Sequence, residues 1–87
     1  MKIIKTIEEK ENEGLLALIG HVVTLFCLNY IYTGELVGVN ETCVKLENAS
    51  IVYETGELTT KAWKDAQKLP HTWYVQTAAI ESFGKLK

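Results

Sequence analysis

The chain has 87 residues, of which 47% are apolar and 23% charged, with a single proline, and this composition is typical of a small globular domain rather than a disordered chain. Its net charge is −2 and the sequence contains no arginine, which disfavours base-specific recognition of nucleic acids. No apolar run approaches the roughly 20 residues of a membrane-crossing helix, and residues 1–14 turn acidic where a signal peptide needs its apolar segment. We therefore expect a soluble, cytoplasmic protein with one domain over residues 1–87, small enough to favour self-association.

The first elements are predicted to be helical. Residues 1–11 alternate basic and acidic side chains around isoleucines at helical spacing, which indicates a frayed helical turn or an arm. A short helix is predicted over about residues 13–19, because Asn12 can cap its start and Gly20 can end it in the left-handed conformation.

Three strands are predicted to follow as an antiparallel meander. Residues 21–28 and 31–39 are rich in β-branched and aromatic side chains and are separated by a turn at Asn29. A tight turn at residues 40–41 leads into a third strand over residues 43–53, where apolar and charged side chains alternate. This alternation predicts a sheet with one buried face.

The last third of the chain breaks this pattern and then returns to it. Residues 59–69 are predicted to form a short helix, with apolar side chains on one face, lysines on the other and Pro70 just past its end. Residues 73–83 are again apolar and aromatic, and they are predicted to form two short strands with a bend near residues 77–79.

Two glycines, Gly34 and Gly38, interrupt the predicted strand 31–39. A single glycine inside a strand marks a bulge, a sharp bend or a close backbone approach. Two glycines four residues apart share one face of the strand, so together they allow it to bend strongly. We assign both a structural role, in letting five strands close into a small barrel.

The stretch YTGELVGVN, with the order of elements around it, resembles the first motif of the Sm and Sm-like proteins. The resemblance covers mostly residues 15–53, with Asn40 where the family has aspartate. The matching residues are Tyr32, Gly34, Leu36, Gly38, Val39, Leu46, Asn48 and Ala49.

This resemblance implies a mainly β fold: a short N-terminal helix, then a strongly bent five-stranded antiparallel barrel over about residues 21–83, with an inserted segment before the last two strands. It also implies a homo-oligomeric ring of about five to seven subunits, in which the fourth strand of one subunit pairs with the fifth of the next. The apolar last segment would be an aggregation hazard unless another chain covered it. The expected interface residues are Trp73, Tyr74, Val75, Ile80 and Phe83.

The positions that bind RNA in the family are altered. The first loop lacks the family's Met-Asn pair, and Gln76 and Thr77 replace its Arg-Gly pair. The possible RNA-binding residues are Asn40, Glu41, Thr42, Gln76 and Thr77. We therefore favour a scaffold that acts through protein contacts, with weakly specific binding of single-stranded RNA as the alternative. A third hypothesis is an unrelated SH3-like adaptor, which would be monomeric in solution.

No catalytic residue, metal site or cofactor is predicted. Cys27 and Cys43 fit no zinc or redox spacing, and we expect both to stay reduced as small apolar side chains. His21 follows the end of the first predicted helix, while Ser50 and Ser82 lack the flanking glycines of a nucleophile elbow. The sequence therefore favours a non-enzymatic protein.

Overall fold

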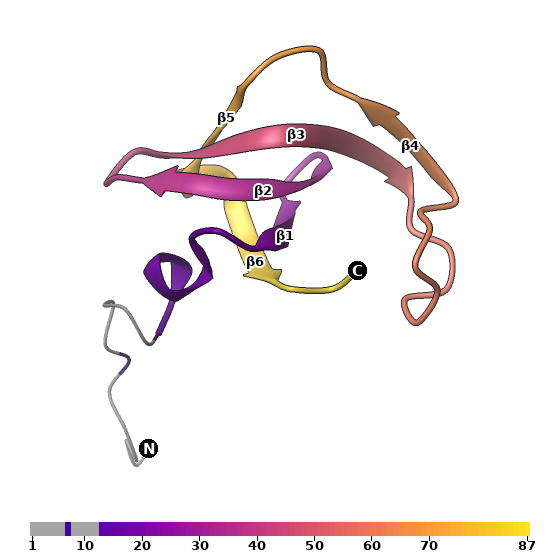
Figure 1. Cartoon of the computed structure of the whole chain (residues 1–87), viewed down its shortest axis with the longest axis horizontal. Helices are drawn as coiled ribbons and strands as arrows, with labels where there is room; N and C mark the ends of the chain where they lie inside the picture. Colours follow the sequence, from indigo (N-terminus) through magenta and orange to yellow (C-terminus); the bar gives the residue numbers. More distant parts are fainter. Residues whose placement is uncertain (1–6, 8–12) are drawn as a thin grey trace.

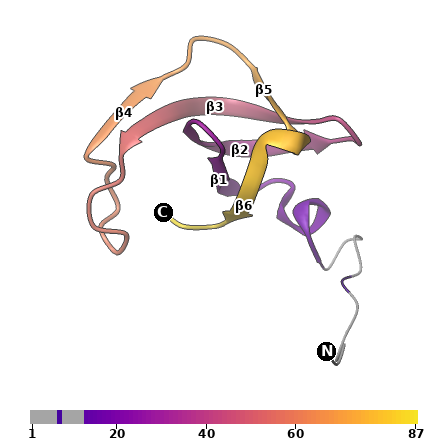
Figure 2. The same cartoon turned by 180° about the vertical axis from the view of Figure 1, so that it is seen from behind.

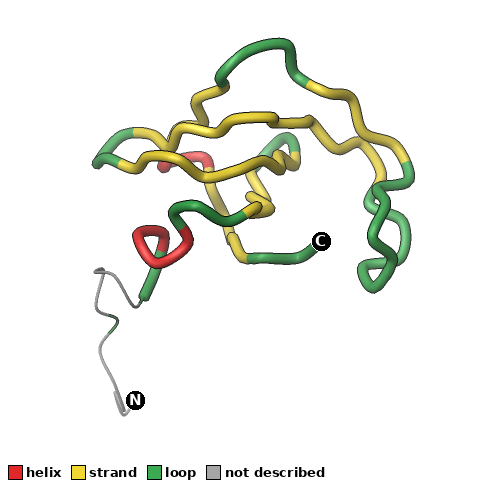
Figure 3. Tube along the Cα trace, in the orientation of Figure 1, coloured by secondary structure: helices red, strands yellow, loops and turns green. Residues whose placement is uncertain are grey.

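The described part of the chain forms one antiparallel sheet of six strands, accompanied by two short 3-10 helices (Figure 1). The computed structural model describes residue 7 and residues 13–87. Figure 3 shows how strands dominate this part of the chain. The arm or helical turn predicted for residues 1–11, except Ile7, and the predicted cap Asn12 lie outside the described residues. The elements are η1 (Leu15–Leu18), β1 (Val22–Cys27), β2 (Ile31–Val39), β3 (Cys43–Glu54), β4 (Asp65–Lys68), β5 (Trp73–Gln76), η2 (Thr77–Ala79) and β6 (Ile80–Gly84).

Strand β3 organises the sheet. The strand order is β4-β3-β2-β1-β6, and β5 pairs with β3 on the same edge as β4. Residues 43–46 of β3 pair with β5, and residues 50–54 pair with β4. Between these two ladders the Leu69 N–H donates to the carbonyl oxygen of Ala49 over 2.8 Å. Figures 1 and 2 show β3 arching beneath β4, β5 and the chain that joins them.

The predicted meander is confirmed, and so is the bend near residues 77–79, which is η2. The number of strands differs from the expectation, six rather than five. The sheet is also not closed into a barrel among the described residues, because β5 pairs with β3 and β6 with β1, while no ladder joins β5 to β6.

The prediction of a helix over residues 59–69 is wrong. Residues 55–64 form a loop, and the next four residues form β4. In the structure Ala66 is exposed and Trp63 only half-buried, so this segment covers little of the core. A helix of this length has little stability without such packing. The edge of β3 offers hydrogen-bond partners to the backbone instead, so strand pairing overrides the helical spacing.

The first helix is shorter and tighter than the predicted one over residues 13–19. It is a 3-10 helix of four residues preceded by Gly14, whose φ is 72°. Gly20 has a φ of 92°, the left-handed conformation expected of a glycine that ends a helix. Only five residues lie between these two positive-φ glycines, so a helix here could not extend beyond little more than one turn.

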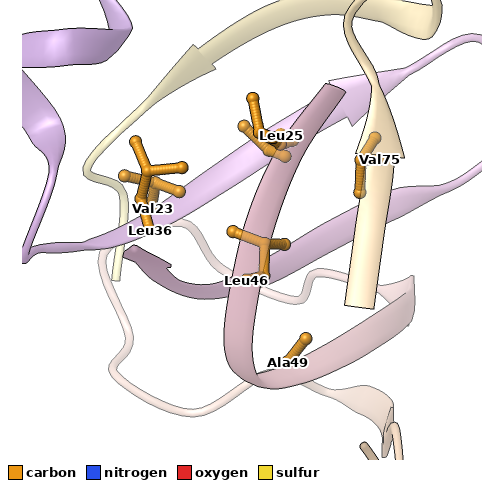
Figure 4. Packing of buried hydrophobic residues seen from close by; sticks show 7 residues of the cluster. Val23, Leu25, Leu36, Leu46, Ala49 and Val75 are labelled. Atoms are coloured by element: carbon orange, nitrogen blue, oxygen red, sulfur yellow. The ribbon is translucent and has the colours of Figure 1, made fainter. Parts of the chain in front are cut away.

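The core lies between the strands, and Figure 4 shows its side chains converging from β1, β2, β3 and β5. They come mostly from alternate positions, as expected when one face of a sheet is buried. The fully or almost fully buried members are Val23, Leu25, Leu36, Val44, Leu46, Ala49 and Val75.

The two glycines of β2 both lie at register irregularities in the β2–β3 ladder, although the barrel that they were expected to help close is not formed, and the two sites differ. A Cβ on Gly34 would lie 3.0 Å from Cα of Ala49 and 3.1 Å from the carbonyl oxygen of Glu47. A Cβ on Gly38 would lie 3.7 Å from Cβ of Lys45, an ordinary contact. Only Gly34 is required by close packing of β2 against β3.

Candidate functional site

The turn between β2 and β3 is built around one side chain. Oδ1 of Asn40 accepts hydrogen bonds from the backbone N–H of Thr42 (2.8 Å), the backbone N–H of Cys43 (2.9 Å) and the Thr42 hydroxyl (3.1 Å). The Asn40 N–H also donates to the carbonyl oxygen of Cys43 over 3.0 Å. Asparagine favours such turns because its side chain can replace a backbone acceptor. The side-chain oxygen of Asn40 is therefore fully engaged in stabilising the turn.

All five residues predicted to bind RNA lie together at one corner of the molecule. The backbone N–H of Thr77 donates to the carbonyl oxygen of Thr42, and its hydroxyl donates to the carbonyl oxygen of Glu41, each over 2.9 Å. Gln76 pairs with Cys43 in the β3–β5 ladder. We call residues 40–42 with residues 76–77 the hairpin corner. It joins segments that the sequence separates by more than thirty residues.

The hairpin corner borders a hollow of about 560 Å³, which is completed by Cys43, Tyr74 and Ala78. The two hydrogen bonds from Thr77 hold the two segments together, while the exposed side chains of Glu41 and Gln76 remain at the surface. Glu41 is the only charged residue among the described residues that line this hollow. A carboxylate repels phosphate, so the electrostatics here oppose a nucleic-acid backbone.

The other side of the hairpin corner opens into a second hollow of about 680 Å³. Its lining includes Asn40, Glu41 and Thr77, together with Leu16 of η1 and Phe83 of β6. Phe83 is 42% exposed and Leu16 40%. Phe83, predicted as an interface residue, therefore lines this second hollow together with the apolar side chain of Leu16.

The predicted interface residues differ in how much of them is accessible. Tyr74 is 59% exposed and Trp73 36%, so both present aromatic surface along β5. Val75 is only 5% exposed and belongs to the core, and Ile80 is half-buried against it. Val75, expected at the interface, is therefore already buried within the single chain. Side chains alternate along a strand, so Val75 and the less exposed Trp73 share the inward face, while Tyr74 and Gln76 share the outward one.

A groove beside β5 is lined partly by residues for which the sequence predicts no function. This groove, of about 240 Å³, is lined by Tyr30 and Tyr32 as well as Trp73 and Tyr74. The rings of Tyr30 and Tyr32 meet edge to face, with centroids 6.4 Å apart. Burial, followed by the nearby Cys27 and other tyrosines, raises the pKa of Tyr32. The available signal was a pair of tyrosines at the start of the predicted strand 31–39, Tyr30 just before it and Tyr32 within it.

Chemistry-bearing side chains are dispersed elsewhere. No group of three or more His, Cys, Asp or Glu side chains that could hold a metal ion occurs in residue 7 or residues 13–87. Cys27 and Cys43 are both free thiols, and burial raises the pKa of Cys27. Within the same part of the chain, no helix has the length and apolar character needed to cross a membrane.

No family model, curated protein or solved structure matches this chain. The resemblance to the Sm-like proteins therefore rests on the sequence motif alone.

Proposed function

We propose that this chain is an Sm-like protein that assembles into a homo-oligomeric ring of about five to seven subunits and acts as a non-catalytic scaffold. The observation that carries the proposal is the pair of open strand edges that flank η2. β5 pairs only with β3, and β6 pairs only with β1, among the described residues. A strand of another copy can add to each of these edges.

The six strands correspond to the five of the Sm-like barrel if β4 and β5 are two halves of one bent strand. Both pair with the same edge of β3, and the Leu69 N–H bonds to β3 between them. Pro70 follows at once and cannot donate to a ladder, which accounts for the break. In this proposal η2 carries the chain from the edge of β3 to the edge of β1, and the sheet stays open between β5 and β6.

The open edge of β5 presents particular backbone groups. Since the N–H of Thr77 points to Thr42 at the end of β3, alternation along an antiparallel strand directs the N–H groups of Tyr74 and Gln76 the other way, towards the open edge. The exposed ring of Tyr74 lies beside them, as the exposed ring of Phe83 lies on β6.

A contact between β5 of one copy and β6 of the next is heterologous, and such contacts produce rings when the rotation closes. Each seam would pair backbone groups that water solvates in the single chain. It would also bury side chains such as Tyr74 and Phe83, at about 1.5–3 kcal/mol for each large apolar side chain, less the cost of association.

The substitution Gln76→Pro tests this seam. Gln76 has φ −69°, which proline adopts without strain, and the N–H that it loses is directed away from β3. We expect light scattering and native mass spectrometry to show that the ring dissociates, because each seam loses about 1–3 kcal/mol, while circular dichroism stays unchanged. The matched control Gln76→Ala keeps the N–H and should keep the ring. Proline at Val75 or Ile80 is a poorer probe, since both side chains pack in or against the core.

A ring that survives Gln76→Pro would show that the contact lies elsewhere on the molecule. A parent protein that is monomeric at micromolar concentration would contradict the ring and favour an SH3-like adaptor.

Weakly specific binding of single-stranded RNA is the second candidate. The observation in its favour is the hairpin corner itself, where all five altered positions meet beside the exposed ring of Tyr74, because aromatic rings can stack on bases. RNA binding is the weaker candidate because Glu41 brings a carboxylate to that hollow, and the described residues lining it include no cation. Titration of oligo-U and oligo-A at two salt concentrations tests it, since binding driven by phosphate contacts must weaken steeply with salt. No binding at low salt would eliminate it.

A further inference from the structure

The loop between β3 and β4 has a defined internal structure. Gly56 has a φ of 69°, and a Cβ there would come within 3.1 Å of Cβ of Lys64, so the loop closes tightly on itself. The Thr60 N–H donates to the carbonyl oxygen of Glu57 over 3.1 Å, and the Thr55 hydroxyl donates to the carbonyl oxygen of Gly56 over 3.0 Å. These bonds organise the backbone of residues 55–60.

Three carbonyl oxygens of this loop converge on one ammonium group. Nζ of Lys87 donates to the carbonyl oxygens of Thr55 (2.7 Å), Glu57 (2.8 Å) and Ala62 (3.0 Å). It also lies 4.5 Å from the centre of the Trp63 ring, within the range of a cation–π interaction. Figures 1 and 2 show the end of the chain beside this loop. We call the three carbonyls and the Trp63 ring the ammonium cage.

The ammonium cage matches the chemistry of one kind of cation. A primary ammonium carries three N–H donors and no acceptor, and the cage supplies three acceptors and an aromatic face. A trimethylated amine could use only the ring, and an acetylated one has no charge and keeps only one N–H donor. The carbonyls come from three separate positions along the loop, so the selectivity is a property of the folded loop.

We propose that the loop over residues 55–63 is a binding site for primary alkylammonium groups, which Lys87 occupies within its own chain and which a lysine side chain or a short diamine can occupy in its place. Lys87 lies beyond β6, whose last residue is Gly84, and residues 85–87 join no strand pairing among the described residues. A side chain held on so short a segment competes at an effective concentration of roughly millimolar. Removing its amine should open the site to ligands from solution.

The first experiment uses the full chain with Lys87→Met, which removes the charge and donors while keeping an unbranched side chain. Nα-acetyl-lysine methylamide and cadaverine are titrated separately, and NMR follows the indole N–H signal of Trp63, identified through Trp73→Phe. Saturable shifts are expected, at least about tenfold tighter than in the parent, where Lys87 competes. The ligand that binds more tightly distinguishes a peptide lysine from a free diamine. Lys85→Met removes the same charge from an exposed neighbour and should behave like the parent.

Controls define the chemistry of the site. The Nε-acetyl and Nε-trimethyl forms of the lysine ligand should bind much more weakly, since each lacks donors that the carbonyls require. Equal shifts with these analogues, or no saturable shift with either amine, would overturn the proposal. Saturation by KCl alone that blocks the amines would assign the site to an alkali cation and would equally overturn it.

A second experiment needs no substitution at Lys87 and so does not depend on the folding of that variant. The parent protein is treated briefly with an acetylating reagent, and mass spectrometry compares the rates of modification of Lys85 and Lys87. We expect Lys87 to react at least about fivefold more slowly, because its amine must first leave the cage. Trp63→Leu should narrow this difference. Equal rates at the two lysines in the parent would contradict the occupancy of the cage.

Discussion

Replacing Gly34 by valine should destabilise the protein by at least about 2 kcal/mol. Gly34 is not among the glycines with positive φ, so the cost is steric. The new Cβ would lie 3.0 Å from Cα of Ala49 and 3.1 Å from the carbonyl oxygen of Glu47. Both are backbone atoms of β3, which is paired along both edges, and such a strand cannot shift without losing ladder hydrogen bonds.

Overpacking a core costs roughly 1–3 kcal/mol, and valine adds two methyl groups beyond the Cβ, which places it in the upper part of that range. A domain of this size loses roughly 4–8 °C of melting temperature for each kcal/mol. The melting temperature should therefore fall by about 8–16 °C.

The assay is denaturant unfolding followed by circular dichroism, with Gly38→Ala as the matched control. A Cβ at Gly38 makes only a 3.7 Å contact with Lys45, so that variant should be neutral or gain up to about 1 kcal/mol from reduced freedom of the unfolded chain. Equal midpoints for Gly34→Val and the parent would refute the close-packing explanation. So would a Gly38→Ala variant as unstable as Gly34→Val.

Three further predictions follow from single side chains. Asn40→Ala should lower the free energy of unfolding by about 1 kcal/mol, since one oxygen accepts three hydrogen bonds; a midpoint equal to that of the parent would contradict this. Burial raises the pKa of Tyr32, so the folded protein favours the neutral phenol. The contribution of this neutral phenol to stability is present below the ordinary tyrosine pKa near 10 and is lost as pH rises through the higher folded pKa. Tyr32→Phe should flatten that alkaline fall in a pH series of unfolding curves. Cys27 and Cys43 should appear as free thiols in mass spectra of unreduced protein, and iodoacetamide should alkylate Cys27 more slowly in the folded than in the unfolded protein, because burial raises its pKa.

The elements predicted well are those in which local chemistry and tertiary structure agree. Residues 31–39 are β2 from end to end, because β-branched and aromatic side chains, two glycines and the Asn40 turn all favour the same strand. The bend at residues 77–79 is likewise flanked by strand-forming sequence on both sides. Local signals were sufficient for these elements.

The failures occur where distant partners decide the structure. Residues 59–69 have helical spacing, but the free edge of β3 captures residues 65–68 as a strand. Val75 has the composition of an interface residue, and only its register opposite Val44 shows that it points into the core. The ammonium cage joins residues of one loop to Lys87 across the fold, and no spacing of residues in the sequence predicts this contact.

The pairing of β6 with β1 has a consequence for the order of folding. β2 and β3 are joined by a short turn, so their long ladder can form early at a small cost in chain entropy. β6 reaches β1 only after almost the whole chain has been ordered, because Thr24 pairs with Gly84. Contacts of such high sequence separation slow folding and form late. We therefore expect β6 to dock last and to open first, so that its amides exchange with solvent sooner than those of β2 and β3.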